Sequence, residues 1–218
     1  MVRTAVLVSG GGTNLQAILD ARLFGELENC DLCAVISSSP EAYALTRAKN
    51  AGVPTYIVDH SLFPTRRAFT TAILDKLKDL DIELVVLAGF MHILGDHLVH
   101  AYEGRMLNVH PSLIPSFCGD GFYGLRVHQA ALAYGVKVTG ATVHFVTSEP
   151  DAGPVVLQRA VDVHEDDTPQ TLQKRVMEEA EWKLLPQAIS LYCEGRLQLD
   201  GRRVIIKPEE KEEASENA

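Results

Sequence analysis

The sequence predicts an α/β protein with a doubly wound, mostly parallel sheet, and three observations lead to this fold class. Short apolar runs alternate with helical patterns through the first 110 residues, with short connections between them. The apolar run at residues 83–88 is suited to a central strand that is covered on both faces. The second half contains longer β-rich segments, so we expect a Rossmann-like sheet with a C-terminal β-rich half.

The elements of the first half follow one another at short intervals. We predict strands at residues 4–9, 30–37, 55–58, 83–88 and 106–109, and helices at 13–23, 42–50 and 66–80. A further short helix is expected before residue 106. The sequence Ala51-Gly52-Val53-Pro54 supplies a stop signal for the second helix. This alternation favours a parallel sheet with right-handed crossovers.

The second half changes character after residue 110. Residues 136–146 and 155–163 read as strands, and a helix is expected from Pro169 with Thr168 as its cap. The Asp200-Gly201 step inside residues 197–206 predicts a terminal hairpin. No internal repeat or linker divides the chain. We therefore expect one domain at residues 1–207, with two halves of different character at 1–110 and 111–207.

Composition and charge limit the kind of protein. The 218 residues are 46% hydrophobic and 22% charged, as in ordinary soluble domains. No apolar stretch reaches membrane-spanning length and the chain starts directly with a strand, so we expect a cytoplasmic protein without a membrane partner. The net charge is −9, and residues 208–218 hold five Glu and one Lys. We expect an acidic disordered tail there, and no nucleic-acid partner for the mildly acidic body.

The four cysteines predict neither disulfides nor a metal site. Cys30 and Cys33 match half of a redox or zinc motif. No helix opens behind this pair and no second pair completes a zinc site, so buried strand cysteines are expected. The isolated Cys118 and Cys193 are interpreted in the same way, and no metal is expected.

The glycine loop Ser9-Gly10-Gly11-Gly12-Thr13-Asn14 joins the first strand to the first helix. Consecutive glycines allow backbone N–H groups to face an anion, and the helix N-terminus favours negative charge. A P-loop would need a lysine here, and a dinucleotide fingerprint would need glycine in place of Leu15. The loop therefore predicts a local phosphate site, with a tight turn that binds no ligand as the alternative.

Two polar residues stand at the end of the last strand of the first half. Asn108 and His110 are two positions apart, so their side chains point to the same face of an extended segment. Pro111 and Pro115 then end the strand in a rigid loop. Carboxyl ends of parallel strands form the sites of such sheets, and a donor beside a titratable ring suits a developing oxyanion.

A carboxylate in the second half could join this pair. Asp151 lies in an Asp-Ala-Gly-Pro turn after the strand that carries His144. Such an aspartate is commonly only a turn former, but beside an imidazole it would raise the pKa of that ring. The residues alone do not show whether these groups meet.

Four segments together resemble the phosphoribosylglycinamide formyltransferase family. They are Ser9–Gln16, Leu87–Leu94, Asn108–Pro115 and Thr142–Pro154, in order within a likeness that runs from residue 4 to about residue 206. The resemblance implies a formyltransferase fold and transfer of the formyl group of 10-formyltetrahydrofolate to the amine of 5-phosphoribosylglycinamide, in purine biosynthesis. It implies a phosphoribosyl-binding half at residues 1–110 and a folate-binding and catalytic half at 111–207. It also implies no metal, small-molecule partners, and a monomer or homodimer.

The resemblance also assigns roles to individual residues. It makes Asn108, His110 and Asp151 the catalytic group, in which Asn108 and His110 donate to the oxyanion. Asp151 would hold His110 cationic or relay protons through water. The family's substrate contacts correspond to Gly12, Thr13, Asn14, Pro111 and Glu181. Its folate contacts correspond to Arg66, Met91, His92, Ile93, Leu94, Asn108, Thr147, Ser148, Glu149, Pro150 and Asp151, and His144 corresponds to a supporting histidine.

Three departures from the family pattern accompany this resemblance. His92 stands where arginine is common, and we expect catalysis to be unaffected by it. The helix that carries Glu181 has one extra residue. The glycine-rich segment at residues 117–127 is longer than in many members, and its glycines predict a mobile lid.

Three alternative functions can be weighed against this one. A methionyl-tRNA formyltransferase would need a further basic domain, whereas this chain ends in acidic residues. A formyltetrahydrofolate hydrolase typically has an N-terminal regulatory domain and lacks the glycine phosphate loop. A binding module without activity would not need Asn108, His110 and Asp151 together.

Overall fold

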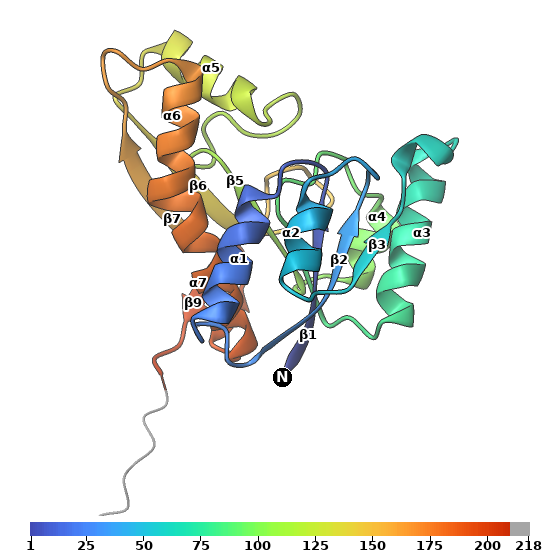
Figure 1. Cartoon of the computed structure of the whole chain (residues 1–218). Coiled ribbons are helices and arrows are strands. Elements are labelled where there is room, and N and C mark those ends of the chain that lie inside the picture. The colour runs from blue at the N-terminus through green and yellow to red at the C-terminus, as the bar shows by residue number, and fades with distance from the viewer. Residues whose placement is uncertain (210–218) are drawn as a thin grey trace, which may run out of the picture.

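The computed structural model describes residues 1–209 and contains one nine-stranded sheet (Figure 1). The strand order is β3-β2-β1-β4-β5-β6-β7-β9-β8. The strands are β1 (Val2–Val8), β2 (Cys30–Ser37), β3 (Thr55–Ile57), β4 (Leu84–Leu87), β5 (Met106–His110), β6 (Val138–Phe145), β7 (Val155–Asp162), β8 (Leu197–Asp200) and β9 (Arg203–Ile206). The helices are α1 (Thr13–Leu23), α2 (Ala44–Asn50), α3 (Arg66–Asp79), α4 (Asp96–Ala101), α5 (Leu125–Tyr134), α6 (Pro169–Val176) and α7 (Trp182–Cys193). The acidic tail expected at 208–218 lies outside the described residues from position 210 onward.

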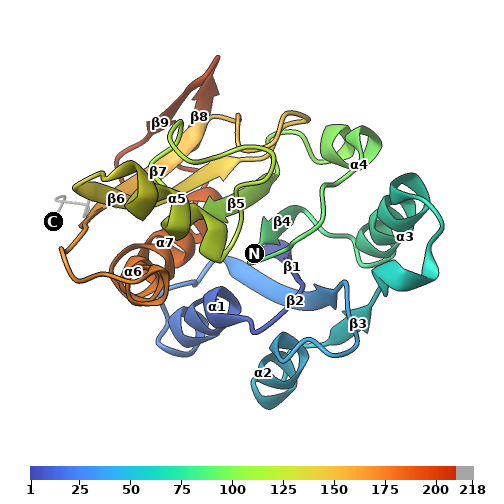
Figure 2. The same cartoon turned by 90° about the horizontal axis from the view of Figure 1, so that it is seen from above.

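The sheet is doubly wound, as the sequence predicts. Strands β1 to β5 pair in parallel, whereas β5–β6, β6–β7 and β8–β9 pair antiparallel. Side chains alternate between the faces of β1, so Val6 packs with α1, α2 and α7, and Leu7 packs with α3 and α4. Figure 2 shows the sheet between these two groups of helices. The fold class is confirmed.

Most elements fall where the sequence places them. Helix α1 and strand β2 have the expected bounds, and the terminal hairpin is present, with Gly201 and Arg202 as its turn residues after Asp200. Thr168 caps α6, because its hydroxyl accepts from the N–H of Thr171 and the Thr171 hydroxyl accepts in return from the N–H of Thr168. These local signals are sufficient to set the ends of the elements.

Two helical features differ from the expectation. The segment 117–127 was expected to be a glycine-rich lid throughout, but its last residues already belong to α5, which begins at Leu125. Val127, His128 and Ala131 are buried at helical spacing and tie this helix to the body of the protein. The helix from Pro169 is interrupted by a π-helical turn, Met177–Glu181, before α7 begins.

Two features are absent from the described part of the chain. Within residues 1–209, none of the helices has the length and apolar character needed to cross a bilayer. The same residues contain no group of three or more His, Cys, Asp or Glu side chains that could hold a metal ion.

Candidate active site

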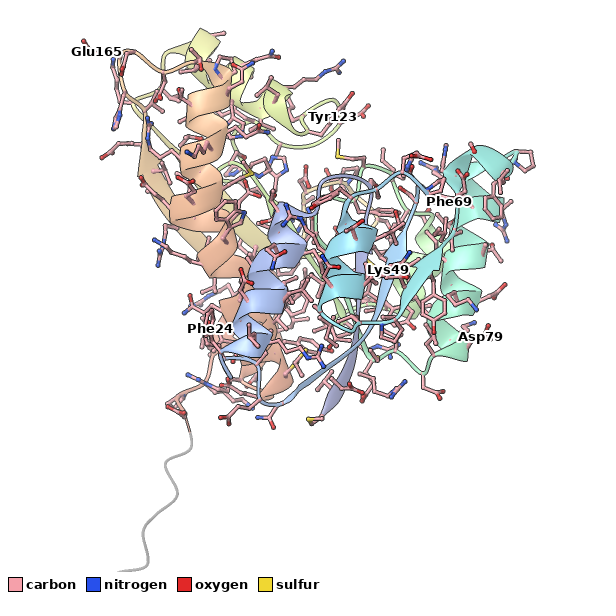
Figure 3. The ribbon with its side chains drawn as sticks, viewed as in Figure 1. Phe24, Lys49, Phe69, Asp79, Tyr123 and Glu165 are labelled. Atoms are coloured by element: carbon pink, nitrogen blue, oxygen red, sulfur yellow. The ribbon has the colours of Figure 1, made fainter. Side chains whose placement is uncertain are left out.

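The candidate site lies at the carboxyl ends of β1, β4 and β5. The glycine loop follows β1, the segment Met91–Leu94 follows β4, and His110 is the last residue of β5. In an open α/β sheet these ends border a crevice. Here the crevice is a cavity of about 590 Å³, which is the size of a site for a small molecule. The side-chain view shows Tyr123 on the loop that precedes α5 (Figure 3).

Asn108 is held by a cross-strand partner. Asn108 on β5 lies opposite His144 on antiparallel β6, and the Asn108 amide nitrogen is 3.1 Å from Nε2 of His144. Nδ1 of His144 is 2.8 Å from the carbonyl oxygen of Phe145, so Nδ1 carries the hydrogen and Nε2 accepts from Asn108. His144 is therefore a strand histidine with a hydrogen bond at each ring nitrogen. It fixes the orientation of the Asn108 amide.

His110 and Asp151 come together across the same edge. Nδ1 of His110 lies 3.4 Å from Oδ2 of Asp151, and Nε2 of His110 donates to the carbonyl of Phe117 at 2.9 Å. Asp151 has a left-handed φ of 53°, and its Oδ2 also accepts from the N–H of Gly119 at 2.9 Å. The other carboxylate oxygen, Oδ1, lies 3.6 Å from Nε2 of His144. The sequence alone could not establish that these groups meet.

The electrostatics of this group correct one expectation. Burial lowers the pKa of His110, and this effect outweighs the opposing influence of Asp151 and of the Phe117 carbonyl. The expectation that Asp151 holds His110 cationic is therefore wrong for the free protein. Burial alone would raise the pKa of Asp151, but the neighbouring His144 and His110 rings and the hydrogen bond from the Gly119 N–H lower it overall. The pair combines a neutral imidazole with a carboxylate.

A second polar pair stands where the cavity approaches the glycine loop. Nδ2 of Asn14 donates to Oε2 of Glu181 at 2.7 Å, and both residues are buried. Burial raises the pKa of Glu181 to about 7, although the Asn14 hydrogen bond opposes this rise. Glu181 is the last residue of the π-helical turn, which absorbs one extra residue and so changes the phase of the helix. This turn directs Glu181 towards Asn14.

The structure brings most of the predicted ligand-binding residues to the cavity wall. They are Asn14, Met91, His92, Ile93, Leu94, Asn108, His110, Pro111, His144, Thr147, Ser148, Pro150, Asp151 and Glu181. The N–H of Met91 donates to the hydroxyl of Ser9 at 2.9 Å, which links this segment to the glycine loop. Gly12 and Thr13 precede Asn14 in the loop but lie outside the wall, as do the exposed residues Arg66 and Glu149.

Several wall residues were not identified from the sequence. Phe122, Tyr123 and Arg126 come from the loop before α5 and from its first turn, and Gln173 and Met177 come from α6 and the π-helical turn. The guanidinium of Arg126 stacks over the Tyr123 ring, 4.9 Å from its centroid. The helical spacing of Val127, His128 and Ala131 was the sequence signal that could have predicted α5.

The buried ring of His128 was also missed. It lies on α5, and within residues 1–209 neither of its nitrogens has a hydrogen-bond partner. Burial lowers the pKa of His128 to about 4, with His110 as a secondary cause. A neutral histidine therefore packs behind the candidate site.

Comparisons with known proteins identify the family of this chain and related solved structures. The sequence model of the family described as "Formyl transferase" matches residues 2–189. A phosphoribosylglycinamide formyltransferase from Haemophilus influenzae is 39% identical over 199 residues, which cover 91% of each chain. The crystal structure of glycinamide ribonucleotide transformylase 1 from Symbiobacterium toebii has a TM-score of 0.89 and 45% identity, with 95% of each chain covered.

A longer relative shares the same region. The trifunctional purine biosynthetic protein adenosine-3 from Bos taurus is 44% identical over 198 residues, 90% of this chain and 19% of the bovine protein. The chain thus spans about a fifth of the length of this relative. The family model and the bacterial relatives cover nearly all of the chain, and the chain belongs to the formyl transferase family, among its phosphoribosylglycinamide formyltransferase members.

Proposed function

We propose that this protein transfers the formyl group of 10-formyltetrahydrofolate to the amine of 5-phosphoribosylglycinamide, in purine biosynthesis. The observation that carries the proposal is the convergence of Asn108, His110 and Asp151 at one end of a cavity whose other end reaches Asn14 beside the glycine loop. Family membership supports the same reaction.

The shape and lining of the cavity fit the two substrates. Phe90, Met91 and Ile93 supply apolar surface for a flat folate ring. Thr147, Ser148 and Asp151, which follow β6, supply polar groups on the opposite side. We assign the ribonucleotide phosphate to Gly12, Thr13 and Asn14, and a sugar contact to Glu181. When bound, the reduced folate supplies the formyl group, and the remaining chemistry falls to the side chains of this chain.

Asn108 stabilises the negative charge that forms on the formyl oxygen, and His110 accepts the proton of the attacking amine. Attack of the substrate amine on the formyl carbon places negative charge on the formyl oxygen, and Asn108 donates a hydrogen bond to it because His144 holds its amide. The attacking amine must lose a proton. Nδ1 of His110 accepts that proton, because Nε2 already bears a hydrogen that it donates to Phe117.

Asp151 completes the proton transfer. In the neutral ring the lone pair of His110 Nδ1 faces Asp151 Oδ2, which is also an acceptor. A proton on Nδ1 converts these two facing acceptors into an ion pair, so the carboxylate stabilises the state that the reaction creates. The proton then passes to the leaving folate nitrogen through the same pair.

The remaining expectations belong to this proposal as well. We assign ribonucleotide binding to residues 1–110 and folate binding with catalysis to residues 111–207, with His92 and Asn108 also contributing to the folate site. Arg66 and Glu149 are proposed to contact the folate after it binds. We further propose a cytoplasmic monomer or homodimer whose only ligands are small molecules.

An assay that measures both products tests the reaction. The purified protein is mixed with 5-phosphoribosylglycinamide and 10-formyltetrahydrofolate, the folate product is followed by absorbance, and the formylated ribonucleotide is identified by mass. Both products are expected in equal amounts. Formate without formylated ribonucleotide would favour a formyltetrahydrofolate hydrolase, and no consumption of the folate would favour a binding module without activity. His110→Ala is the control for catalysis by this site, and a rate that it leaves unchanged would refute the assignment.

A further inference from the structure

Helix α2 packs directly behind the glycine loop. The backbone N–H of Ala44 donates to the carbonyl of Gly10 at 3.1 Å. The fit is tight, because a Cβ atom placed on Gly12 would come within 2.6 Å of the Ala44 Cβ. The conformation of the loop is therefore set from outside the cavity, by a helix that contributes nothing to the cavity wall.

Arg47 on α2 makes the second contact to the loop. Its Nε donates to the carbonyl of Gly11 at 2.9 Å, and its Nη1 donates to Oε1 of Gln16 on α1 at 2.9 Å. The guanidinium also lies over the Tyr43 ring, 5.1 Å from the centroid. A planar guanidinium fixed at two nitrogens and stacked on a ring has little freedom to move.

These contacts decide which way the loop amides face. In a trans peptide the carbonyl of one residue and the N–H of the next point in opposite directions. Because Gly10 O binds Ala44 and Gly11 O binds Arg47, the N–H groups of Gly11 and Gly12 are turned away from α2. Gly12 O accepts from Gln16, so the carbonyls of all three glycines are occupied.

The amides that remain are suited to an anion. Within residues 1–209, the N–H groups of Gly11, Gly12 and Thr13 donate to no acceptor. A cationic donor on the Gly11 carbonyl also polarises the Gly11–Gly12 peptide, which makes the N–H of Gly12 a better donor. Arg47 therefore both orients and strengthens the donors, without lining the cavity that holds the reacting groups.

We propose that Arg47 is a positioning residue for substrate phosphate: it clamps the Gly11 carbonyl so that the loop amides face the phosphate group. This inference rests on the proposed function for the identity of the substrate. It adds a residue on α2, behind the loop, that determines how strongly the enzyme distinguishes a phosphorylated substrate from an unphosphorylated one.

Variants of Arg47 test this role. Arg47→Ala removes both hydrogen bonds and should raise KM for 5-phosphoribosylglycinamide about tenfold, the size expected for loss of a charged hydrogen bond. The kcat should change less than about twofold, because the groups at Asn108 and His110 are untouched. KM for the same substrate without its 5-phosphate should stay unchanged. Arg47→Lys keeps the positive charge but lacks the planar guanidinium that donates two hydrogen bonds, so it should give an intermediate KM.

The control is Lys49→Ala, which removes an exposed positive charge from the same helix (Figure 3). It should leave both KM values unchanged. Binding of inorganic phosphate, followed by calorimetry, provides a readout that does not depend on the reaction. It should weaken about tenfold in Arg47→Ala. This measurement separates failure of the proposed function, where phosphate binding would still respond to Arg47, from failure of the inference.

Two outcomes would overturn the inference. One is an equal rise in KM for the phosphorylated and unphosphorylated substrates, which would indicate general loss of structure. The other is unchanged phosphate binding in both Arg47 variants. If Arg47→Ala does not fold, as judged by circular dichroism, the same comparison is made with Arg47→Lys.

Discussion

Oδ2 of Asp151 lies 3.4 Å from Nδ1 of His110, while the other nitrogen of that ring donates to the main-chain carbonyl of Phe117. A carbonyl oxygen only accepts, so the hydrogen of the neutral ring is on Nε2. The distance to Asp151 is long for a hydrogen bond, as expected when two acceptors face each other. The free protein thus holds a proton acceptor beside the group that will stabilise the proton.

The pH dependence of turnover follows from this arrangement. Burial places the pKa of His110 below its usual value of 6.5, and the neutral ring is the form that accepts the proton. We therefore expect kcat/KM to rise with pH through a pKa below 6.5 and to be level around neutrality. A profile measured in one constant-ionic-strength buffer series checks this. Activity that falls as the pH rises through this region would mean that the cationic ring is the active form.

Replacing Asp151 should slow the chemical step. Asp151→Asn keeps the shape of the side chain but cannot form an ion pair with protonated His110, so we expect kcat to fall by about 100-fold or more. The comparison variant is Asp75→Asn, which makes the same change at an exposed position on α3, outside the cavity wall. Single-turnover rates distinguish chemistry from product release. Equal rates for the two variants would exclude the role given to Asp151.

The fold could be predicted from the sequence because the patterns that define its helices and strands are local. Apolar runs, caps and glycine stops set α1, β2 and α6 without knowledge of distant contacts. Strand periodicity likewise predicted that the side chains of Asn108 and His110 point to the same face of β5. Helix α5 was missed because the glycines that precede Leu125 extended the expected loop into its first turn.

Other features of the site depend on tertiary structure. The approach of Asp151 to His110 requires the β6–β7 connection to fold over the end of β5, which no local pattern predicts. The direction of Glu181 depends on a π-helical turn that breaks the ordinary helical period. The lowered pKa of His110 depends on burial, and burial outweighs the neighbouring carboxylate that the sequence suggested.

Glu181 should make stability depend on pH. Its pKa is about 7 in the folded protein and 4.5 in the reference state, so between these values the folded state holds a proton that the unfolded state has lost. The free energy of unfolding should therefore decrease as pH rises from about 4.5 to about 7, by on the order of 3 kcal/mol. Glu181→Gln does not titrate and should lose this part of the pH dependence.

Urea denaturation of both proteins at several pH values measures this difference. The wild type should lose stability relative to Glu181→Gln as the pH rises, and the gap should stop changing above the folded pKa of about 7. Other titrating groups contribute equally to both proteins and cancel in the comparison. Parallel curves for the two proteins would show that Glu181 is already ionised when buried.

Two adjacent glycines of the phosphate loop should respond differently to alanine. Gly12 has a left-handed φ of 72°, and an added Cβ would approach Ala44, whereas Gly11 has open space at the same place. Gly12→Ala should lower the free energy of unfolding by about 1–3 kcal/mol and weaken ribonucleotide binding, because the strain disturbs the loop amides. Gly11→Ala should change stability by less than about 0.5 kcal/mol. Thermal melts and calorimetric titration of the ribonucleotide measure both effects. Equal responses of the two variants would show that α2 does not constrain the loop.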